Sequence, residues 1–201
     1  MNGKSLLAVQ YNPFHITLTH NFCDDIIKTG DSLNIKNAKI KDGELSTIEE
    51  ATIADGNSAN RSSKISWLDD KELQTTLSHF IQSANRESNW NFSLKEFESL
   101  QYTIYNKGDH YNWHTDNHVK PYKNNTIRKL SFTLCLNDEY EGGDFEICDP
   151  HPEPDLSKTS TFTFKKGSII VFPSHVWHRV KPVTKGIRKS LVGWIVGTPF
   201  I

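Results

Sequence analysis

The sequence is poor in cysteine, and its few cysteines do not form a cross-linking or metal-binding pattern. Three cysteines among 201 residues are an odd number, and no two of them have CxxC spacing. This argues against a disulfide framework and against a thiolate zinc site. We expect all three to be small core side chains: Cys23, Cys135 and Cys148.

The chain also lacks an excess of charge and a long hydrophobic run. Its formal net charge is -1, which gives no sign of an electrostatic partner such as nucleic acid or a membrane surface. The N-terminal segment MNGKSLLAVQYNPF contains an apolar stretch that is too short for the core of a signal peptide. We therefore expect a cytoplasmic protein with neither a membrane nor a nucleic-acid partner.

No feature of the chain marks a boundary between domains. There is no internal repeat, low-complexity tract or Gly/Ser-rich linker, and the length suits one domain. We expect a single domain over 1–201, with helices and a hairpin as support over 1–95 and a strand-rich core over 96–198.

Two segments of the N-terminal part have helical periodicity. Residues 69–86 place apolar side chains along one face of a helix: Leu73, Leu77, Phe80, Ile81 and Ala84. Residues 22–33 predict a shorter helix with Asn21 as its cap. Both helices are expected to pack against the core.

Between these helices the sequence favours strands and then a loop. Residues 35–40 and 45–53 are β-leaning runs separated by Lys-Asp-Gly-Glu at 41–44, and Asp-Gly is a strong hairpin signal. Residues 54–63 are small and polar without periodicity, which predicts a loop.

From Leu100 onward the pattern changes to short runs rich in Tyr, Phe, Thr, Val and Ile, separated by turn residues. Many short strands with regular turns are typical of a β-sandwich or a jelly roll. Together with the preceding helices they predict an α+β fold, in which a double-stranded β-helix (jelly-roll) core is supported by N-terminal helices.

A possible metal site lies in the segment YNKGDHYNWHTD. If this segment is extended, His114 and Asp116 project from the same face. A third ligand is offered by His175 or His178, which follow the apolar run 169–172, and spacing does not choose between them. The long separation from Asp116 suits opposite strands of a small barrel. Two histidines and one carboxylate are typical of non-haem Fe(II) enzymes.

Several spacings together resemble one known family. The pattern contains Tyr105-x-x-Gly108-x-x-Tyr111-x-x-His114-x-Asp116, then Arg128-x-x-Ser131, then Gly142-Gly143, then His178 with Arg188 ten residues later and Trp194 after it. It resembles the prolyl-4-hydroxylase-like branch of the 2-oxoglutarate/Fe(II) dioxygenases, and most closely the PKHD-type hydroxylases. The resemblance is good over residues 95–197 and weaker before them.

The resemblance implies a role for several of these residues in the catalytic core. It implies that His114, Asp116 and His178 are the iron ligands and that His175 is not one of them. Arg188 then binds the distal carboxylate of 2-oxoglutarate, which suits the planar fork of a guanidinium. Tyr105 and Ser131 match hydroxyl groups that help to hold this carboxylate. Thr133, on the same strand face as Ser131, is a rival donor.

The implied reaction consumes Fe(II)-bound 2-oxoglutarate and O2, releases succinate and CO2, and hydroxylates a substrate. Ascorbate (vitamin C) is a further candidate cofactor. A prolyl residue of a peptide or protein is the first expectation for the substrate, with lysyl residues, free amino acids and other small molecules as alternatives. Candidate substrate contacts, chosen by their position, are Arg61, Trp113, His118 and Tyr122, and the loops 54–63, 117–126 and 149–155 are candidates to line the mouth.

Three rival functions use the same residues differently. The iron chemistry could act on nucleic-acid bases, which would require a basic groove that the net charge of -1 does not favour. The jelly roll could be a non-catalytic metal-binding module, but such a module would not need Arg188. A zinc hydrolase would need a positioned general base, and the sequence shows no convincing candidate.

Overall fold

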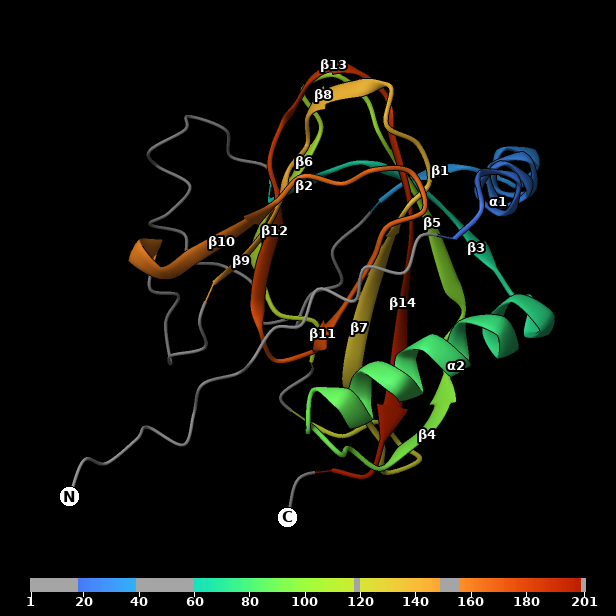
Figure 1. Ribbon diagram of the computed structural model, residues 1–201, viewed down its shortest axis with the longest axis vertical. Coiled ribbons are helices and arrows are strands. Elements are labelled where there is room, and N and C mark those ends of the chain that lie inside the picture. The colour runs from blue at the N-terminus through green and yellow to red at the C-terminus, as the bar shows by residue number, and fades with distance from the viewer. Residues whose placement is uncertain (1–17, 39–59, 118–119, 149–155, 200–201) are drawn as a thin grey trace.

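Two antiparallel sheets face each other, and two helices lie on the outer side of the larger sheet (Figure 1). The computed structural model describes residues 18–38, 60–117, 120–148 and 156–199. Its helices are α1 (His20–Ser32) and α2 (Lys71–Glu87), with the short 3-10 turn η1 (Leu156–Lys158). None of the helices in these ranges is long and apolar enough to cross a membrane.

The larger sheet has seven strands in the order β1-β3-β5-β14-β7-β11, with β4 paired to β14. These strands are β1 (Lys36–Asn37), β3 (Lys64–Leu68), β4 (Leu94–Phe97), β5 (Leu100–Tyr105), β7 (Ile127–Cys135), β11 (Ile169–Pro173) and β14 (Arg188–Gly197).

The smaller sheet has five strands in the order β10-β9-β12-β6-β2, and β13 pairs with β8 as a separate ribbon. These strands are β2 (Arg61–Ser62), β6 (His110–His114), β8 (Tyr140–Gly142), β9 (Phe145–Cys148), β10 (Thr159–Phe162), β12 (Trp177–Val180) and β13 (Val183–Gly186). The predicted jelly-roll core with supporting helices is therefore present.

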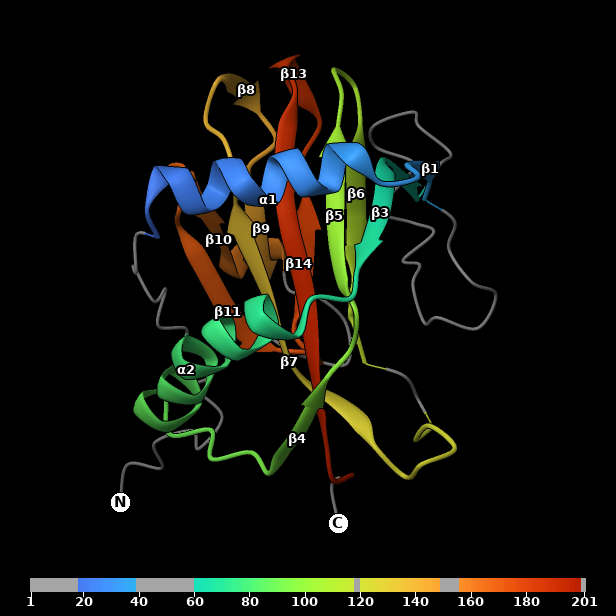
Figure 2. The same cartoon turned by 90° about the vertical axis from the view of Figure 1, so that its right-hand side faces the viewer.

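The two faces of β14 have different neighbours because side chains alternate along a strand. Leu191 and Ile195 belong to the hydrophobic core that includes buried residues of both helices. Figure 2 shows α1 and α2 crossing the outer face of the larger sheet, where this core lies. The other face of β14 is turned toward the smaller sheet, so this strand separates the packing core from the space between the sheets.

Both predicted helices are present, but their starts differ from the predicted ones. Helix α1 begins two residues earlier than expected, because the Thr19 hydroxyl accepts a hydrogen bond from the Phe22 N–H at 3.3 Å. The prediction of Asn21 as the cap was therefore wrong. Helix α2 begins after Asp70, whose carboxylate accepts from the Leu73 N–H at 2.9 Å.

The segment between the helices contributes strands to both sheets. β1 lies within the predicted first strand of the hairpin, but it pairs with β3. The expected turn at 41–44 and the second strand at 45–53 lie outside the described residues. The predicted loop 54–63 ends in β2, which pairs with β6, so the loop prediction was wrong at Arg61–Ser62. The N-terminal part thus builds the sheets as well as supporting them.

Replacing Leu77 by alanine should lower the free energy of unfolding by about 2–5 kcal/mol, because this side chain of α2 is fully buried against the larger sheet. Urea unfolding measures the loss. His79→Ala, on the exposed face of the same helix, is the matched control and should change the value by less than about 0.5 kcal/mol. Equal effects of the two changes would contradict this packing.

Candidate active site

The pairing of β6 with β12 brings two histidines together. His178 lies directly opposite His114 in the register of these neighbouring antiparallel strands. The two strands are therefore adjacent, and the expectation of opposite strands in a barrel was wrong. Asp116 follows β6, and its N–H donates to the Ser174 carbonyl at 2.9 Å, which fixes the chain where it leaves the strand.

The three side chains converge on one point. The Asp116 carboxylate oxygens lie 3.8 Å from His114 Nε2 and 3.5 Å from His178 Nε2. Among the described residues these side chains form the group that could hold a metal ion, with one donor atom of each within 4.8 Å of the others. All three side chains are buried. One chelating centre is thus assembled from two strands and the residues that follow one of them.

Backbone carbonyls orient both imidazole rings. His114 Nδ1 lies 2.7 Å from the Asn112 carbonyl, and His178 Nδ1 lies 3.0 Å from the Val176 carbonyl. A carbonyl oxygen can only accept, so Nδ1 carries the proton in each contact, and Nε2 keeps its lone pair toward Asp116. The Tyr111 ring stacks on His114 with 3.5 Å between ring centroids, which holds this imidazole from the side.

The protonation states also suit a cation. Burial raises the pKa of Asp116, but His178, His114, Arg128 and the Ser131 hydroxyl lower it more, to about 2. Burial, and then the neighbouring His178, hold the pKa of His114 well below its usual value. The carboxylate is therefore ionised and this imidazole neutral near pH 7, which are the forms that coordinate a metal.

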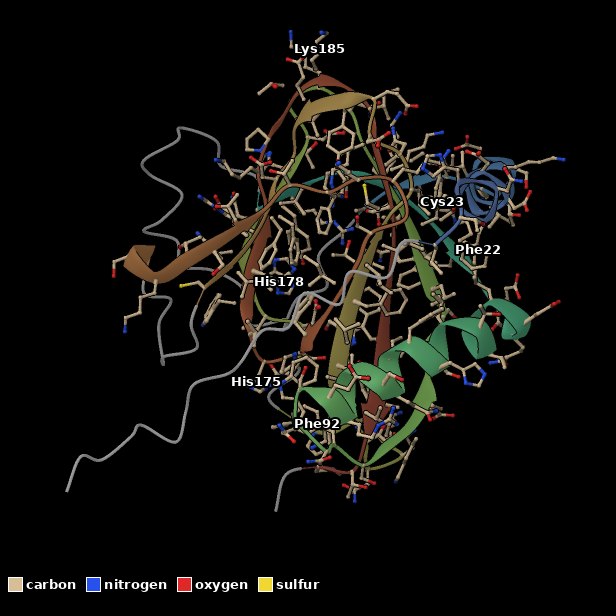
Figure 3. All side chains as sticks on the ribbon, viewed as in Figure 1. Phe22, Cys23, Phe92, His175, His178 and Lys185 are labelled. Atoms are coloured by element: carbon tan, nitrogen blue, oxygen red, sulfur yellow. The ribbon has the colours of Figure 1, made fainter. Side chains whose placement is uncertain are left out.

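These residues fit Fe(II). Two imidazoles and one carboxylate on one side of a metal leave coordination positions open on the other side, as non-haem Fe(II) sites require. Asp116 Oδ2 is buried and has no hydrogen-bond partner among the described residues. Figure 3 shows His178 on β12 and His175 lower down, toward the turn that precedes this strand. His175 is not part of the group of converging donors.

A cavity of about 400 Å³ between the two sheets contains this centre. Its wall on the larger sheet follows the inner face of β14, where alternate residues line it: Arg188, Ser190, Val192 and Trp194. His114, Asp116 and His178 line the same cavity from the side of the smaller sheet. The candidate metal centre and a buried cation therefore line the same cavity.

Arg188 ends this cavity as a deeply buried charge. Only 1% of its surface is exposed, and its Nη1 donates to the Ser190 hydroxyl at 3.0 Å. Its Nε and Nη2 atoms are buried without a hydrogen-bond partner among the described residues. A guanidinium with free donors in a cavity is suited to bind a carboxylate through two parallel hydrogen bonds.

The predicted hydroxyl partners of Arg188 lie at different distances from it. Tyr105 is its direct neighbour across the β5–β14 pair, with the guanidinium carbon 5.3 Å from the ring centre. Ser131 instead donates to the Ser174 hydroxyl at 2.9 Å and lies beside the Asp116 carboxylate. Thr133 lines the cavity whereas Ser131 does not.

Of the four predicted substrate contacts, two line the cavity. These are Arg61, which hydrogen-bonds Gln101 at 2.7 Å, and Tyr122, whose hydroxyl donates to Glu98 at 3.0 Å. Trp113 lies on the other face of β6 from His114 and packs against Arg179 at 4.8 Å, so the structure does not place it in the cavity. His118 lies outside the described residues, as do most of the loop 54–63 and residues 149–155.

Comparisons with known proteins agree with this geometry. Residues 100–196 match the 2OG-Fe(II) oxygenase superfamily. A PKHD-type hydroxylase of Synechococcus sp. (strain CC9605) is 31% identical over 186 residues, which cover 89% of this chain and 77% of that protein. A PKHD-type hydroxylase of Idiomarina loihiensis is 36% identical over 103 residues, which cover 50% of this chain but only 43% of that protein.

This chain belongs to the PKHD-type hydroxylases of the 2OG-Fe(II) oxygenase superfamily. The predicted resemblance is therefore confirmed, and this chain is an enzyme of the dioxygenase class. Membership implies Fe(II) and 2-oxoglutarate, which the buried His-Asp-His group and the buried arginine suit.

Solved structures confirm the fold of this PKHD-type hydroxylase. The viral collagen prolyl hydroxylase of Paramecium Bursaria Chlorella virus-1, solved with 2OG, superposes with a TM-score of 0.66 at 17% identity, covering 96% of this chain and 100% of that one. A Pseudomonas putida prolyl-4-hydroxylase gives a TM-score of 0.54 at 19% identity, covering 90% and 99%. At these identities the comparison supports the double-stranded β-helix and not the substrate.

The sequence assigned no role in this site to Glu98, Trp67 or Arg128, although Arg128 belongs to the family pattern. The guanidinium carbon of Arg128 lies 4.1 Å from the centre of the Trp194 ring, and its Nε and Nη2 donate to the two Glu98 oxygens at 2.8 and 2.7 Å. The ring centres of Trp67 and Trp194 lie 6.2 Å apart, and the Trp67 residue is 50% exposed. All four side chains line the cavity on the side away from Arg188.

His178→Ala should weaken Fe(II) binding by more than about 100-fold, because even outer partners of metal ligands contribute 10- to 100-fold. His175→Ala is the matched control and should bind the metal normally, since its side chain is outside the converging group. Anaerobic calorimetry with Fe(II) measures both. Loss of metal in the His175 variant alone would contradict the assignment of His178.

Proposed function

We propose that this PKHD-type hydroxylase uses Fe(II), 2-oxoglutarate and O2 to hydroxylate a prolyl residue of a peptide or protein, with release of succinate and CO2. One observation carries the proposal: a buried arginine with unused donors lies in the same cavity as a buried His-Asp-His group. A metal that only stabilises a fold would have no need of this arginine.

Each part of the cavity then has its own task. His114, Asp116 and His178 would hold the iron, and Arg188 would hold the distal carboxylate of 2-oxoglutarate. When bound, the iron and the cosubstrate supply the oxidising chemistry. The protein supplies orientation and exclusion of water, and ascorbate is a candidate reductant that keeps the metal in its Fe(II) state.

The remaining end of the cavity supports a prolyl substrate. Trp194 and Trp67 offer aromatic faces there, and Tyr122 and the Arg128–Glu98 pair offer polar groups beside them. Arg128 also donates to the Asp116 carbonyl at 3.2 Å, so this surface is joined to the metal centre. Aromatic-lined grooves bind extended proline-rich segments through the flat apolar ring of proline.

A free amino acid is the second candidate, because the cavity has room for a small molecule as well as a cosubstrate. A peptide is favoured because Trp67 carries the aromatic surface out of the cavity, where a free amino acid would not reach it.

The three cysteines are buried free thiols, which suits the expected cytoplasmic location.

The main test adds 2-oxoglutarate to the Fe(II)-loaded protein without oxygen. We expect the weak visible charge-transfer band of the chelate and then, on addition of O2, succinate release that increases with proline-containing peptides.

Arg188→Ala should raise the Kd of 2-oxoglutarate by about 10-fold or more, because it removes charged hydrogen bonds, and should leave iron bound.

The matched control for this test is Lys189→Ala. Lys189 is the neighbouring cation on β14, but it points to the opposite face and pairs with Asp31 at 2.7 Å. This variant should bind 2-oxoglutarate normally. A metal-loaded protein without the band would refute the proposed cosubstrate. If free proline is turned over and none of the proline-containing peptides is, the proposed peptide substrate is refuted.

Trp67→Ala should raise KM for proline-containing peptides about 5- to 30-fold, because truncating an aromatic contact residue at a binding surface costs about 1–2 kcal/mol. The Kd of 2-oxoglutarate should not change. Ile187→Ala is the control, since this exposed apolar residue is outside the cavity. An unchanged peptide KM in the Trp67 variant would show that substrate does not use this surface.

A further inference from the structure

Tyr140 has no assigned role, yet the fold holds it against Arg188. It is the first residue of β8 and lies opposite Gly186 of β13, two residues before the arginine. A Cβ added to Gly143 would lie 3.0 Å from Arg188 Cδ and 3.4 Å from Tyr140 Cε2. The arginine stem and the tyrosine ring therefore flank the same glycine, whose φ of +65° also favours having no side chain.

The phenol group of Tyr140 lies among the polar groups behind the guanidinium. Its oxygen is 3.6 Å from Cys135 Sγ. Cys135 lies opposite Ser190 in the β7–β14 register, and the Ser190 hydroxyl accepts from Arg188 Nη1. Burial raises the pKa of Tyr140 and Arg188 opposes the rise, so the phenol stays neutral close to the positive charge.

The other neighbours of the guanidinium constrain it in a different way. The rings of Tyr105 and Phe164 lie 5.3 and 5.8 Å from its central carbon. Rings at these distances restrict where the plane of the guanidinium can lie, but they do not determine which nitrogens face the cavity. Polar atoms are needed for that: the Ser190 hydroxyl accepts from Nη1, and the Tyr140 phenol supplies a second polar atom on the side of β8 and β13.

We propose that Tyr140 is a positioning residue for the cosubstrate, whose phenol oxygen holds the Arg188 fork in the orientation that receives the distal carboxylate of 2-oxoglutarate. The inference rests on the proposed role of Arg188. Cys135 orients the phenol in turn, through its contact with Tyr140 and its approach to the Asn137 carbonyl at 2.9 Å.

The test compares two oxo acids on the Fe(II)-loaded protein by calorimetry without oxygen. In Tyr140→Phe the Kd of 2-oxoglutarate should rise about 3- to 10-fold, because the Arg188 fork loses one of the polar contacts that orient it. The Kd of 2-oxobutyrate, which has no distal carboxylate, should stay the same. In the Arg188→Ala background the same change should have no further effect, because the two residues act as a unit.

Tyr102→Phe is the matched control. It removes a phenol that donates to Asp31 at 2.7 Å and lies outside the cavity, so the affinity for both acids should be unchanged. Unaltered 2-oxoglutarate affinity in Tyr140→Phe overturns the inference, as does an equal loss for both acids or a loss that persists without Arg188. Normal affinity in Arg188→Ala refutes the anchor itself, and with it both proposals.

Discussion

The alternation of side chains along β14 is the constraint on which the rest of this structure depends. The strand pairs with β5 on one side and with β7 on the other, so its ten residues cannot turn without breaking both sets of backbone hydrogen bonds. Leu191 and Ile195 face the helices, while Arg188 and Trp194 face the cavity. At about 3.3 Å per residue, roughly 20 Å separates Arg188 from Trp194 along the strand, which leaves room for two ligands in line.

Burial without full pairing makes this cavity costly to the apo fold. Arg188 has unused donors and Asp116 an unused oxygen, both shielded from water. The neighbours of Asp116 already stabilise its ionised form, but a buried guanidinium with unused donors costs several kcal/mol until a ligand of opposite charge binds it. A carboxylate at Arg188 and a cation at Asp116 would complete both ends. The site is thus prepared for its ligands at the expense of stability.

The sequence predicts the chemistry of the site better than its geometry. The HxD spacing placed His114 and Asp116 together, but choosing between His175 and His178 needs the point where the turn ends and β12 begins, which a pairing register decides. The three alternate residues of β7, from Ser131 to Cys135, share one face, so alternation could not rank them. Their position along the strand does: Ser131 is near Asp116 and Cys135 is near Arg188.

The site residues that the sequence did not predict were missed for one physical reason. Glu98 lies beside Arg128, and Tyr140 beside Arg188, because segments that are distant in the chain meet there, and no local period encodes such contacts. Each is an unremarkable polar residue near a turn when read alone. Arginine is the feature that identifies them, because a buried guanidinium needs several acceptors or rings around it.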